Sequence, residues 1–124
     1  EFIHAPKACA SVGPYSHCVK AGSTYYLCGQ VPFHPVTGEV VGNGMKEQAV
    51  QTLANMKAVL EAAGLAVTDI AKTTVFVTNM DDFAAFNEVY AAFMGEHRPA
   101  RVCVEVSNIA HGCLLEMDAI CFKE

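Results

Sequence analysis

The alternation of apolar and polar residues is clearest in the stretch RPARVCVEV at residues 98–106. Successive side chains of a β-strand point to opposite faces, so three valines share one face of this stretch. Arg101, Cys103 and Glu105 share the other face. The pattern therefore predicts a strand that carries an arginine and a glutamate on its less apolar side.

Three further segments have the pattern of β-strands. The stretch HCVKAGSTYYLCGQV at 17–31 predicts a β-hairpin with its turn at 21–23. β-branched residues dominate AKTTVFVT at 71–78, and LLEMDAICF at 114–122 is strongly apolar. The proline- and glycine-marked segment after the hairpin predicts a connection with one short strand at 39–41.

Two segments repeat apolar residues at the spacing of an α-helix. The first runs from Met45 to Ala63, and Gly64 marks its end. The second follows Asp81, which can cap its N-terminus, and Gly95 closes it. The predicted core positions are Ala49, Leu53, Met56, Leu60 and Ala63 in the first helix and Phe83, Phe86, Val89, Tyr90 and Phe93 in the second. Each helix is therefore expected to pack one apolar face on a sheet.

In chain order the elements read β-β-(β)-α-β-α-β-β, which predicts an α+β fold with two α-helices on one face of a mixed β-sheet. The other face would be uncovered, and we expect Cys103, Met117 or their neighbours to be exposed there. An apolar surface of that size on a small protein indicates an interface. We therefore expect an oligomer, and the alternative is a monomer with a partly apolar face.

Composition limits the classes of partner. A chain of 124 residues is expected to form a single domain over 1–124. Its net charge of −5, with only 8 lysines and arginines, argues against nucleic-acid and membrane-surface partners. The sequence has neither an apolar run of 18 residues nor a charged and apolar leader. We therefore expect a cytoplasmic protein, with a mitochondrial location as the alternative.

The six cysteines lack the spacing of a disulfide framework or a zinc site. There is no C-x-x-C motif, and His111 and Cys113 are too close in sequence for a structural zinc pair. Four cysteines lie within apolar strand patterns, where a thiol behaves as a small core residue. We therefore expect reduced structural thiols and no metal at Cys9, Cys18, Cys28, Cys103, Cys113 and Cys121.

Six blocks of sequence carry a resemblance to a known family. They are GPYSH at 13–17, CGQVPFHPVTGEVV at 28–41, LEAAG at 60–64, KTTVFVTNMDDFAAFNEVY at 72–90, PARVCVEV at 99–106 and LLEMDAI at 114–120. In this order they resemble the RidA (YjgF) family of imine deaminases. The resemblance implies a chorismate-mutase-like fold and a homotrimer with active sites between subunits. It also implies hydrolysis of 2-iminobutanoate and 2-iminopropanoate, which pyridoxal-phosphate enzymes release, to 2-keto acids and ammonia.

The chemistry of this reaction suits two residues of the blocks. Hydrolysis of a 2-imino acid requires a held carboxylate, a protonated nitrogen and a placed water, but no metal, cofactor or covalent nucleophile. Arg101 suits the carboxylate, because a guanidinium donates two parallel charge-assisted hydrogen bonds to it. Glu116 lies on an apolar strand, where partial burial would raise its pKa, and it would orient the water and shuttle a proton.

The resemblance implies four more pocket residues. Tyr15 would reach the substrate, Asn87 would lie at the rim of the cleft, and Cys28 and Cys103 would line the pocket. Other roles stay open at this point. Arg101 could instead form an ion pair with another strand or subunit, and Glu116 could be a solvated edge residue. Tyr15 could be a half-buried aromatic residue at a turn, and Cys103 a nucleophile without an assigned histidine.

The sequence also departs from the common pattern of the family. Cys28 replaces a common serine, His17 a common glutamine, and Val102 a hydroxyl residue, and the loop before RPAR is short. A thiol is a weaker hydrogen-bonding group than a hydroxyl, so the substrate range is open. Two other functions also remain: an endoribonuclease or translation inhibitor, which the acidic charge disfavours, and a non-catalytic module that binds keto acids through Arg101.

Overall fold

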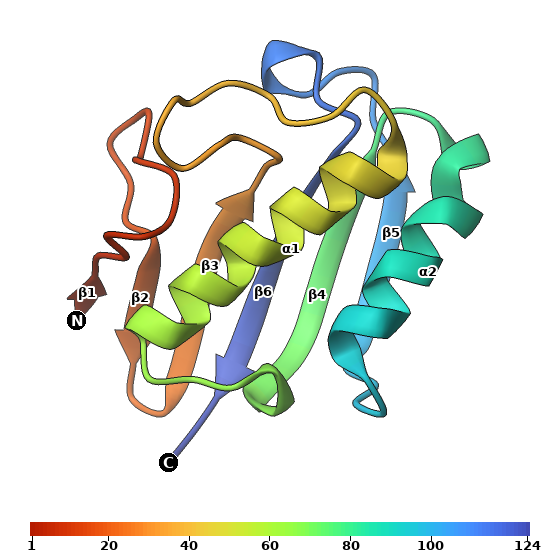
Figure 1. The fold of residues 1–124 in the computed structure, drawn as a ribbon. Helices are drawn as coiled ribbons and strands as arrows, with labels where there is room; N and C mark the ends of the chain where they lie inside the picture. Colours follow the sequence, from red (N-terminus) through yellow and green to blue (C-terminus); the bar gives the residue numbers. More distant parts are fainter.

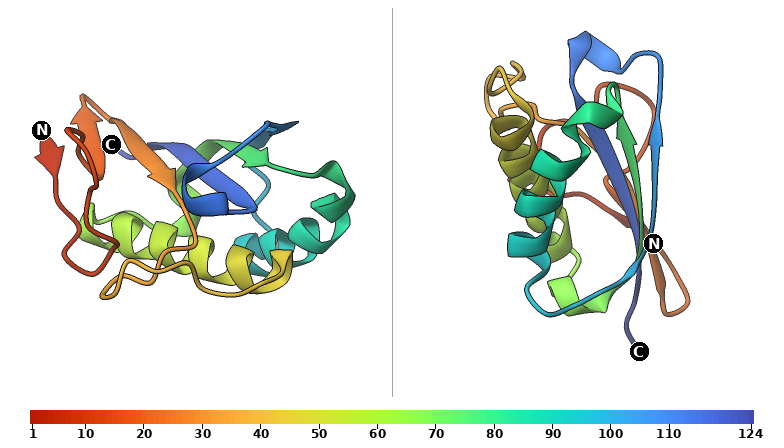
Figure 2. Two further views of the ribbon diagram at one scale, coloured as in Figure 1. Left: turned by 90° about the horizontal axis from the view of Figure 1, so that it is seen from above. Right: turned by 90° about the vertical axis from the view of Figure 1, so that its right-hand side faces the viewer.

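The computed structural model describes residues 1–124 as one six-stranded β-sheet with two α-helices packed on one of its faces (Figure 1). The strands are β1 (Phe2–Ile3), β2 (Cys18–Ala21), β3 (Thr24–Gln30), β4 (Ile70–Val77), β5 (Ala100–Glu105) and β6 (Leu115–Phe122). The helices are α1 (Met45–Ala62) and α2 (Phe83–Met94). Seen edge-on in Figure 2, both helices lie on the same side of the sheet, and the opposite face is bare.

The sheet is mixed, with the strand order β1-β2-β3-β6-β4-β5. Only β4 and β5 pair in parallel, and α2 makes the connection between them. This arrangement confirms the predicted α+β fold. Two short strands differ from the prediction. The strand expected at 39–41 is a single bridge between Phe33 and Val40, and the two-residue strand β1 pairs with β2 at the sheet edge.

Helix α1 begins at the predicted residue and ends one residue before the predicted end. Gly64 follows it with φ of +73°, a conformation that a residue without Cβ adopts at no steric cost. The Leu65 N–H then donates a hydrogen bond of 2.8 Å to the Leu60 carbonyl, which closes the last turn. The glycine stop predicted from sequence is thus confirmed.

The start of α2 differs from the prediction that Asp81 caps it. A 3₁₀ turn over Met80–Asp82 precedes the helix, and Asn79 Oδ1 accepts a 2.9 Å hydrogen bond from the Asp81 N–H. Asp82 occupies the cap position of α2 without a side-chain hydrogen bond. The run Asn-Met-Asp-Asp offers several capping oxygens in a row, so the sequence alone does not select among them.

The helix-covered face of the sheet holds the core, and its composition corrects one prediction. Cys103 and Met117 do not lie on the bare face: Met117 is fully buried under the helices, and Cys103 packs against the same cluster. The exposed large apolar residues of β3, β5 and β6 are instead Tyr26, Val102, Val104, Ile120 and Phe122. Alternation predicts that residues share a face but not which face the helices cover.

Helix α1 also buries three polar side chains, at the helical spacing i, i+4 and i+7. Gln48, Thr52 and Asn55 are each at most 4% exposed. The Asn55 amide nitrogen donates hydrogen bonds of 2.9 Å to the carbonyls of Val31 and Phe33, immediately after β3. Asn55 therefore fixes the path of the chain where it leaves the sheet.

Gln48 makes a similar bridge two turns closer to the start of α1. Its amide nitrogen donates to the Gly42 carbonyl at 3.1 Å, and its oxygen accepts from the Leu114 N–H at 2.8 Å. Gly42 lies in the connection before α1, and Leu114 is the residue before β6. A single buried amide thus ties the connection before α1 to the start of β6, and Leu114 lies 66 residues after Gln48 in the chain.

These buried groups allow a matched pair of substitutions. The Thr52 hydroxyl is fully buried without a hydrogen-bond partner, so Thr52→Val is expected to raise the free energy of unfolding by about 1 kcal/mol. Asn55→Leu leaves two buried carbonyls unpaired and is expected to lower it by about 2–4 kcal/mol. Urea unfolding of both variants measures the difference. Equal losses would contradict the role given to Asn55.

Candidate active site

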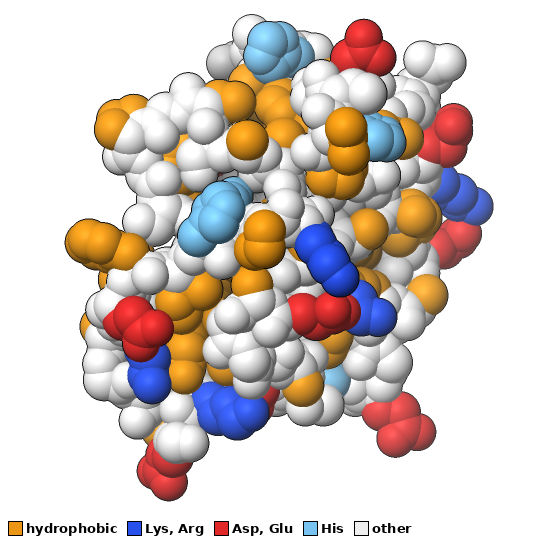
Figure 3. Space-filling model, turned by 60° about the vertical axis from the view of Figure 1, so that its left-hand side comes forward, with side chains coloured by type: hydrophobic (Ala, Val, Ile, Leu, Met, Phe, Trp, Pro, Cys, Tyr) orange, Lys and Arg blue, Asp and Glu red, His pale blue; other side chains and the backbone are white.

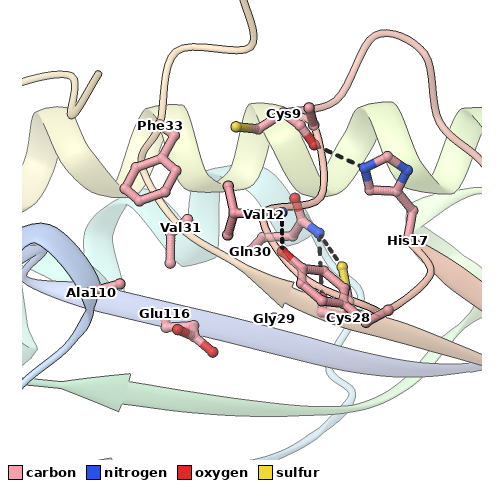
Figure 4. A pocket seen from close by; sticks show the side chains of 12 residues that line it. Cys9, Val12, His17, Cys28, Gly29, Gln30, Val31, Phe33, Ala110 and Glu116 are labelled. Atoms are coloured by element: carbon pink, nitrogen blue, oxygen red, sulfur yellow. Dashed lines mark hydrogen bonds between the residues drawn. The ribbon is translucent and has the colours of Figure 1, made fainter. Parts of the chain in front are cut away.

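A cavity of about 340 Å³ lies at the end of β3, beside β6 and the loop that precedes β2 (Figure 4). Apolar side chains and thiols form most of its wall, and Glu116 is its only acidic residue. The lining residues are Cys9, Ala10, Val12, Tyr15, His17, Cys28, Gly29, Gln30, Val31, Phe33, Ala110 and Glu116. Three of the residues predicted from sequence, Tyr15, Cys28 and Glu116, therefore meet in one cavity.

Glu116 projects from β6 into this cavity (Figure 4). Burial raises the pKa of its carboxyl group above the ordinary value, and the nearby charge of Asp118 raises it further. The carboxyl group forms neither an ion pair nor a hydrogen bond within the chain. A partly buried carboxylate without a partner binds a proton more readily than a solvated one, so Glu116 is a candidate proton acceptor.

The backbone of β3 approaches Glu116 closely at Gly29. A Cβ atom at this position would overlap Glu116 Oε2. The pairing of β3 with β6 shifts register between Leu27 and Gln30, which marks a bulge at this point of the strand. A side chain at position 29 would therefore displace the Glu116 carboxylate, and glycine lets that carboxylate lie against the strand backbone at the bulge.

Next to Gly29, Cys28 is held by Gln30. The Gln30 amide nitrogen lies 3.1 Å from Cys28 Sγ and 3.3 Å from the Cys28 carbonyl oxygen. Burial is the main cause that raises the pKa of the Cys28 thiol to about 11. The thiol is therefore protonated at neutral pH and serves as a wall of the cavity rather than as a nucleophile.

The opposite wall is a loop that His17 fixes in place. The Ala5 N–H donates to His17 Nδ1 at 2.9 Å, so Nε2 carries the proton and donates to the Cys9 carbonyl at 2.8 Å. Tyr15 belongs to the same loop, and its hydroxyl accepts a 3.3 Å hydrogen bond from the Val12 N–H. The imidazole thus bridges two loop segments that close the cavity (Figure 4).

Arg101 and Asn87 line a second hollow, of about 450 Å³, beside α2 and the start of β5. Arg101 Nη1 donates a 2.8 Å hydrogen bond to Asn87 Oδ1. Its guanidinium carbon lies 4.9 Å from the centre of the Tyr90 ring and 5.3 Å from that of Phe83. Arg101 has no carboxylate partner in the chain, because the only ion pair joins Lys46 to Glu88. The predicted carboxylate clamp is therefore oriented by neutral neighbours and unpaired.

The two hollows lie on opposite faces of the sheet. Residues that pair directly on neighbouring strands share a face. Glu116 pairs with Phe76, which pairs with the exposed Val104 on the bare face. Arg101 pairs with Thr73, which is fully buried under the helices. Within one chain the structure therefore does not bring Arg101 and Glu116 together.

Cys103 lines neither of the two hollows. Burial raises the pKa of its thiol, and the charge of Arg101 offsets only part of that shift. The interpretation of Cys103 as an activated nucleophile is therefore not supported. No group of three or more histidine, cysteine or acidic side chains in the chain could hold a metal ion.

All six cysteines are free, as the sequence predicts. Burial raises the pKa of every one of their thiols, to about 11 at Cys113 and about 12 at Cys121. We expect neither a reductant nor a chelator to change the melting temperature, and we expect alkylation at pH 8 to be slow. A fall in melting temperature with a chelator would indicate a bound metal.

The surface is acidic overall but mixed in detail. Acidic and basic side chains are interspersed on the face shown in Figure 3, and the basic ones do not gather into one patch there. None of the helices has the length and apolar character that crossing a bilayer requires. The surface thus offers no extended basic footprint on this face for a nucleic acid.

Solved structures of RidA and YjgF proteins share this fold over nearly their whole length. RidA from the Antarctic bacterium Psychrobacter has a TM-score of 0.94 and 41% identity, with 99% of each chain covered. Escherichia coli TdcF with bound serine also has a TM-score of 0.94 and 41% identity, covering 100% of this chain and 99% of that one. These structures define the class to which the fold belongs.

The sequence matches place the chain within that class. Residues 4–123 match the family model described as Endoribonuclease L-PSP, and the chain belongs to this family, also called RidA/YjgF. It is 48% identical over 124 residues to a RutC family protein of Pyrococcus horikoshii, covering 100% of this chain and 98% of that protein. It is 45% identical over 124 residues to the 2-iminobutanoate/2-iminopropanoate deaminase of Escherichia coli, covering 98% and 96%.

Sequence reasoning missed several residues that shape the cavity. Gly29 and Gln30 stand in the block CGQVPFHPVTGEVV, but their contacts depend on the bulge. Asn55 and Gln48 left a signal that could have found them, since both stand on the apolar side of a helix at regular spacing. A polar residue on a predicted core face requires hydrogen-bond partners and so indicates a structural bridge.

Proposed function

We propose that this protein is a 2-iminobutanoate/2-iminopropanoate deaminase that works as a homotrimer with active sites between subunits. Membership of the RidA/YjgF family and 45% identity to a deaminase support the activity. The position of Arg101 and Glu116 on opposite faces of the sheet supports the shared site. A four-carbon substrate is too small to contact both residues of one chain, so a second copy supplies one of them.

In the proposed site, Arg101 binds the substrate carboxylate through two parallel hydrogen bonds. Its Asn87 partner and the aromatic rings of α2 hold the guanidinium in one orientation. Tyr15, Cys28 and Glu116 of a neighbouring subunit surround the C=N group. Cys103 packs against the core cluster on the same face of β5 as Arg101, and its expected place in the pocket wall is proposed for the assembled site.

The proposed reaction adds water and releases ammonia. Glu116 accepts a proton from water as the oxygen attacks the C=N carbon of the protonated imine, and the C=N π electrons move to the nitrogen. Glu116 returns the proton to that nitrogen, the C–N bond breaks as an oxygen electron pair forms the C=O bond, and the hydroxyl proton passes through Glu116 to the departing ammonia, so that the 2-keto acid and ammonium result. The balance of the reaction requires water alone, and the raised pKa of Glu116 makes this carboxylate a better proton acceptor than a solvated one.

An oligomer is expected because the bare sheet face is apolar, and the resemblance to the RidA (YjgF) family is the reason for proposing three copies. Val104 is 40% exposed and Phe122 is 51% exposed in the single chain, and surfaces of this kind are usually covered by a partner. Light scattering is expected to give about three times the chain mass of 13.3 kDa. Val104→Asp should dissociate the assembly, whereas Val36→Asp, in the exposed connection, should not. A stable micromolar monomer would contradict both the trimer and the shared site.

A coupled assay tests the proposed activity. An amino-acid oxidase generates the imine of 2-aminobutyrate, and semicarbazide traps the imine that remains. The protein is expected to reduce the yield of trapped imine in proportion to its concentration. An unchanged yield of trapped imine, with the protein present in excess, would contradict the proposed deaminase activity.

Two other functions have specific outcomes in the same set of experiments. Saturable binding of 2-ketobutyrate without imine loss would indicate a keto-acid sensor, a possibility consistent with the serine bound by TdcF. Degradation of RNA would indicate the endoribonuclease of the family's description. The net charge of −5 disfavours this second function, because RNA binding depends on basic contacts.

A further inference from the structure

The chain contains only two arginines, Arg98 and Arg101, and both line the same hollow of about 450 Å³. The other lining residues are Asn87, Tyr90, Ala91 and Pro99. No acidic side chain is among them. The hollow therefore places two positive charges together in a protein whose net charge is −5.

Neither guanidinium is neutralised within the chain, since the only ion pair joins two other residues. Arg98 Nη1 donates hydrogen bonds to the carbonyls of Gly95 at 2.6 Å and His97 at 2.9 Å. Arg101 Nη1 donates only to Asn87. Each side chain is thus oriented through one nitrogen, and the remaining N–H groups of two five-donor forks are available to a ligand.

A purely structural interpretation is that Arg98 caps the C-terminal end of α2. It accounts for the two carbonyl contacts, which involve a single nitrogen. It does not use the other N–H groups of Arg98, which line the same hollow as Arg101, where a bound anion would be attracted to both positive charges. A ligand with two carboxylates would satisfy both forks.

We propose that Arg98 binds a second carboxylate of the substrate, so that the preferred substrates are dicarboxylic 2-imino acids, such as the imines of aspartate and glutamate. This inference rests on the proposed function, in which Arg101 holds the first carboxylate. Arg98 determines specificity by contacting the end of the substrate side chain. Monocarboxylic imines bind through Arg101 alone.

Stable keto acids test this assignment without turnover. 2-Oxoglutarate and 2-oxopentanoate have the same carbon chain and differ in the second carboxylate. Calorimetry is expected to show that 2-oxoglutarate binds about tenfold more tightly than 2-oxopentanoate. This gain in affinity is small for a charge-assisted pair, because Arg98 is exposed to solvent. Added salt should reduce this ratio of affinities.

Variants test whether Arg98 causes the preference for 2-oxoglutarate over 2-oxopentanoate. Arg98→Gln is expected to lower the ratio of affinities to about one, and Arg98→Lys, which keeps the charge but not the fork, to an intermediate value. Lys57→Gln, on α1 and away from the hollow, should leave the ratio unchanged. A ratio near one in the unmodified protein, or a ratio that survives Arg98→Gln, would overturn the proposal.

The imine assay separates this inference from the proposed function. With imines of glutamate and norvaline, the ratio of kcat/KM values should follow the ratio of affinities. Hydrolysis of both imines with equal efficiency would contradict the role of Arg98 but would support the proposed deaminase activity. Tighter binding of 2-oxoglutarate without hydrolysis of any imine would contradict the proposed deaminase activity but would support the dicarboxylate-binding site.

Discussion

Arg101→Ala is expected to lower kcat/KM for the imine of 2-aminobutyrate by about two to four decades. Each charge-assisted hydrogen bond to a carboxylate contributes roughly 1.5–3 kcal/mol, and the substitution removes two of them. Arg101→Lys keeps the charge but loses the planar fork, so it should fall between the alanine variant and the unmodified protein or near the alanine variant. Binding of 2-ketobutyrate should weaken in parallel, because the product carries the same carboxylate.

The structure adds a control to this experiment. The Arg101 guanidinium packs over the rings of Phe83 and Tyr90 of α2, so the alanine variant also loses some packing and its melting temperature must be measured. Lys57→Gln removes a cation from the exposed side of α1 and should retain full kcat/KM. If Arg101→Ala dissociates the oligomer while the residual trimer keeps full turnover, the arginine is an interface residue instead of a clamp.

Glu116→Gln is expected to reduce kcat by about two to four decades, because the amide cannot accept the proton of the attacking water. The loss should appear in kcat and kcat/KM alike, since Glu116 acts in the chemical step. The assay with trapped imine measures both quantities. A variant with unchanged kcat would exclude Glu116 as the proton acceptor.

The pH dependence of activity identifies the same group. The pKa of Glu116 is raised by burial first and by Asp118 second, so the acid limb of the kcat/KM profile should lie above the ordinary carboxyl range. Asp118→Asn removes the second cause and should move that limb to lower pH. A limb that stays in place would assign it to another group.

Removing the charge of Glu116 should raise the stability of the fold, although it lowers activity. A carboxyl group whose pKa is higher in the folded state stabilises the fold below its unfolded pKa, and this contribution is lost as pH rises through the folded pKa. At pH 7 the charged and partly buried Glu116 therefore destabilises the fold. Glu116→Gln should raise the melting temperature while it removes activity, and a lower melting temperature would show that the carboxylate has a stabilising partner in the assembly.

The candidate site divides into parts that the sequence predicts and parts that it does not. Family resemblance selects Tyr15, Cys28, Asn87, Arg101 and Glu116, and the structure places each of these in one of two hollows. Their roles remain proposals. The contact between Gly29 and Glu116 and the bridge made by Asn55 depend on atoms that meet only in the folded chain.

The sequence by itself determined the order and type of the main elements. Local rules suffice for this, because α1 has an apolar stripe with a glycine stop at Gly64, and the hairpin β2–β3 has its turn at Gly22. The same rules failed at the start of α2, where several equivalent capping oxygens adjoin. Local rules also predicted which residues of β5 share a face, but not which of the two faces the helices cover.

Only the tertiary structure decided that last point, and the site depends on it. Helix α2 covers the side of β5 that carries Arg101, because its aromatic rings pack on the guanidinium and its Tyr90 hydroxyl bonds to Thr73 at 2.8 Å. The valines of β5 are left on the bare face with Glu116. Alternation has a period of two and is symmetric between faces, so it carries no information about which layer packs above. The separation of Arg101 from Glu116 thus arises from helix packing.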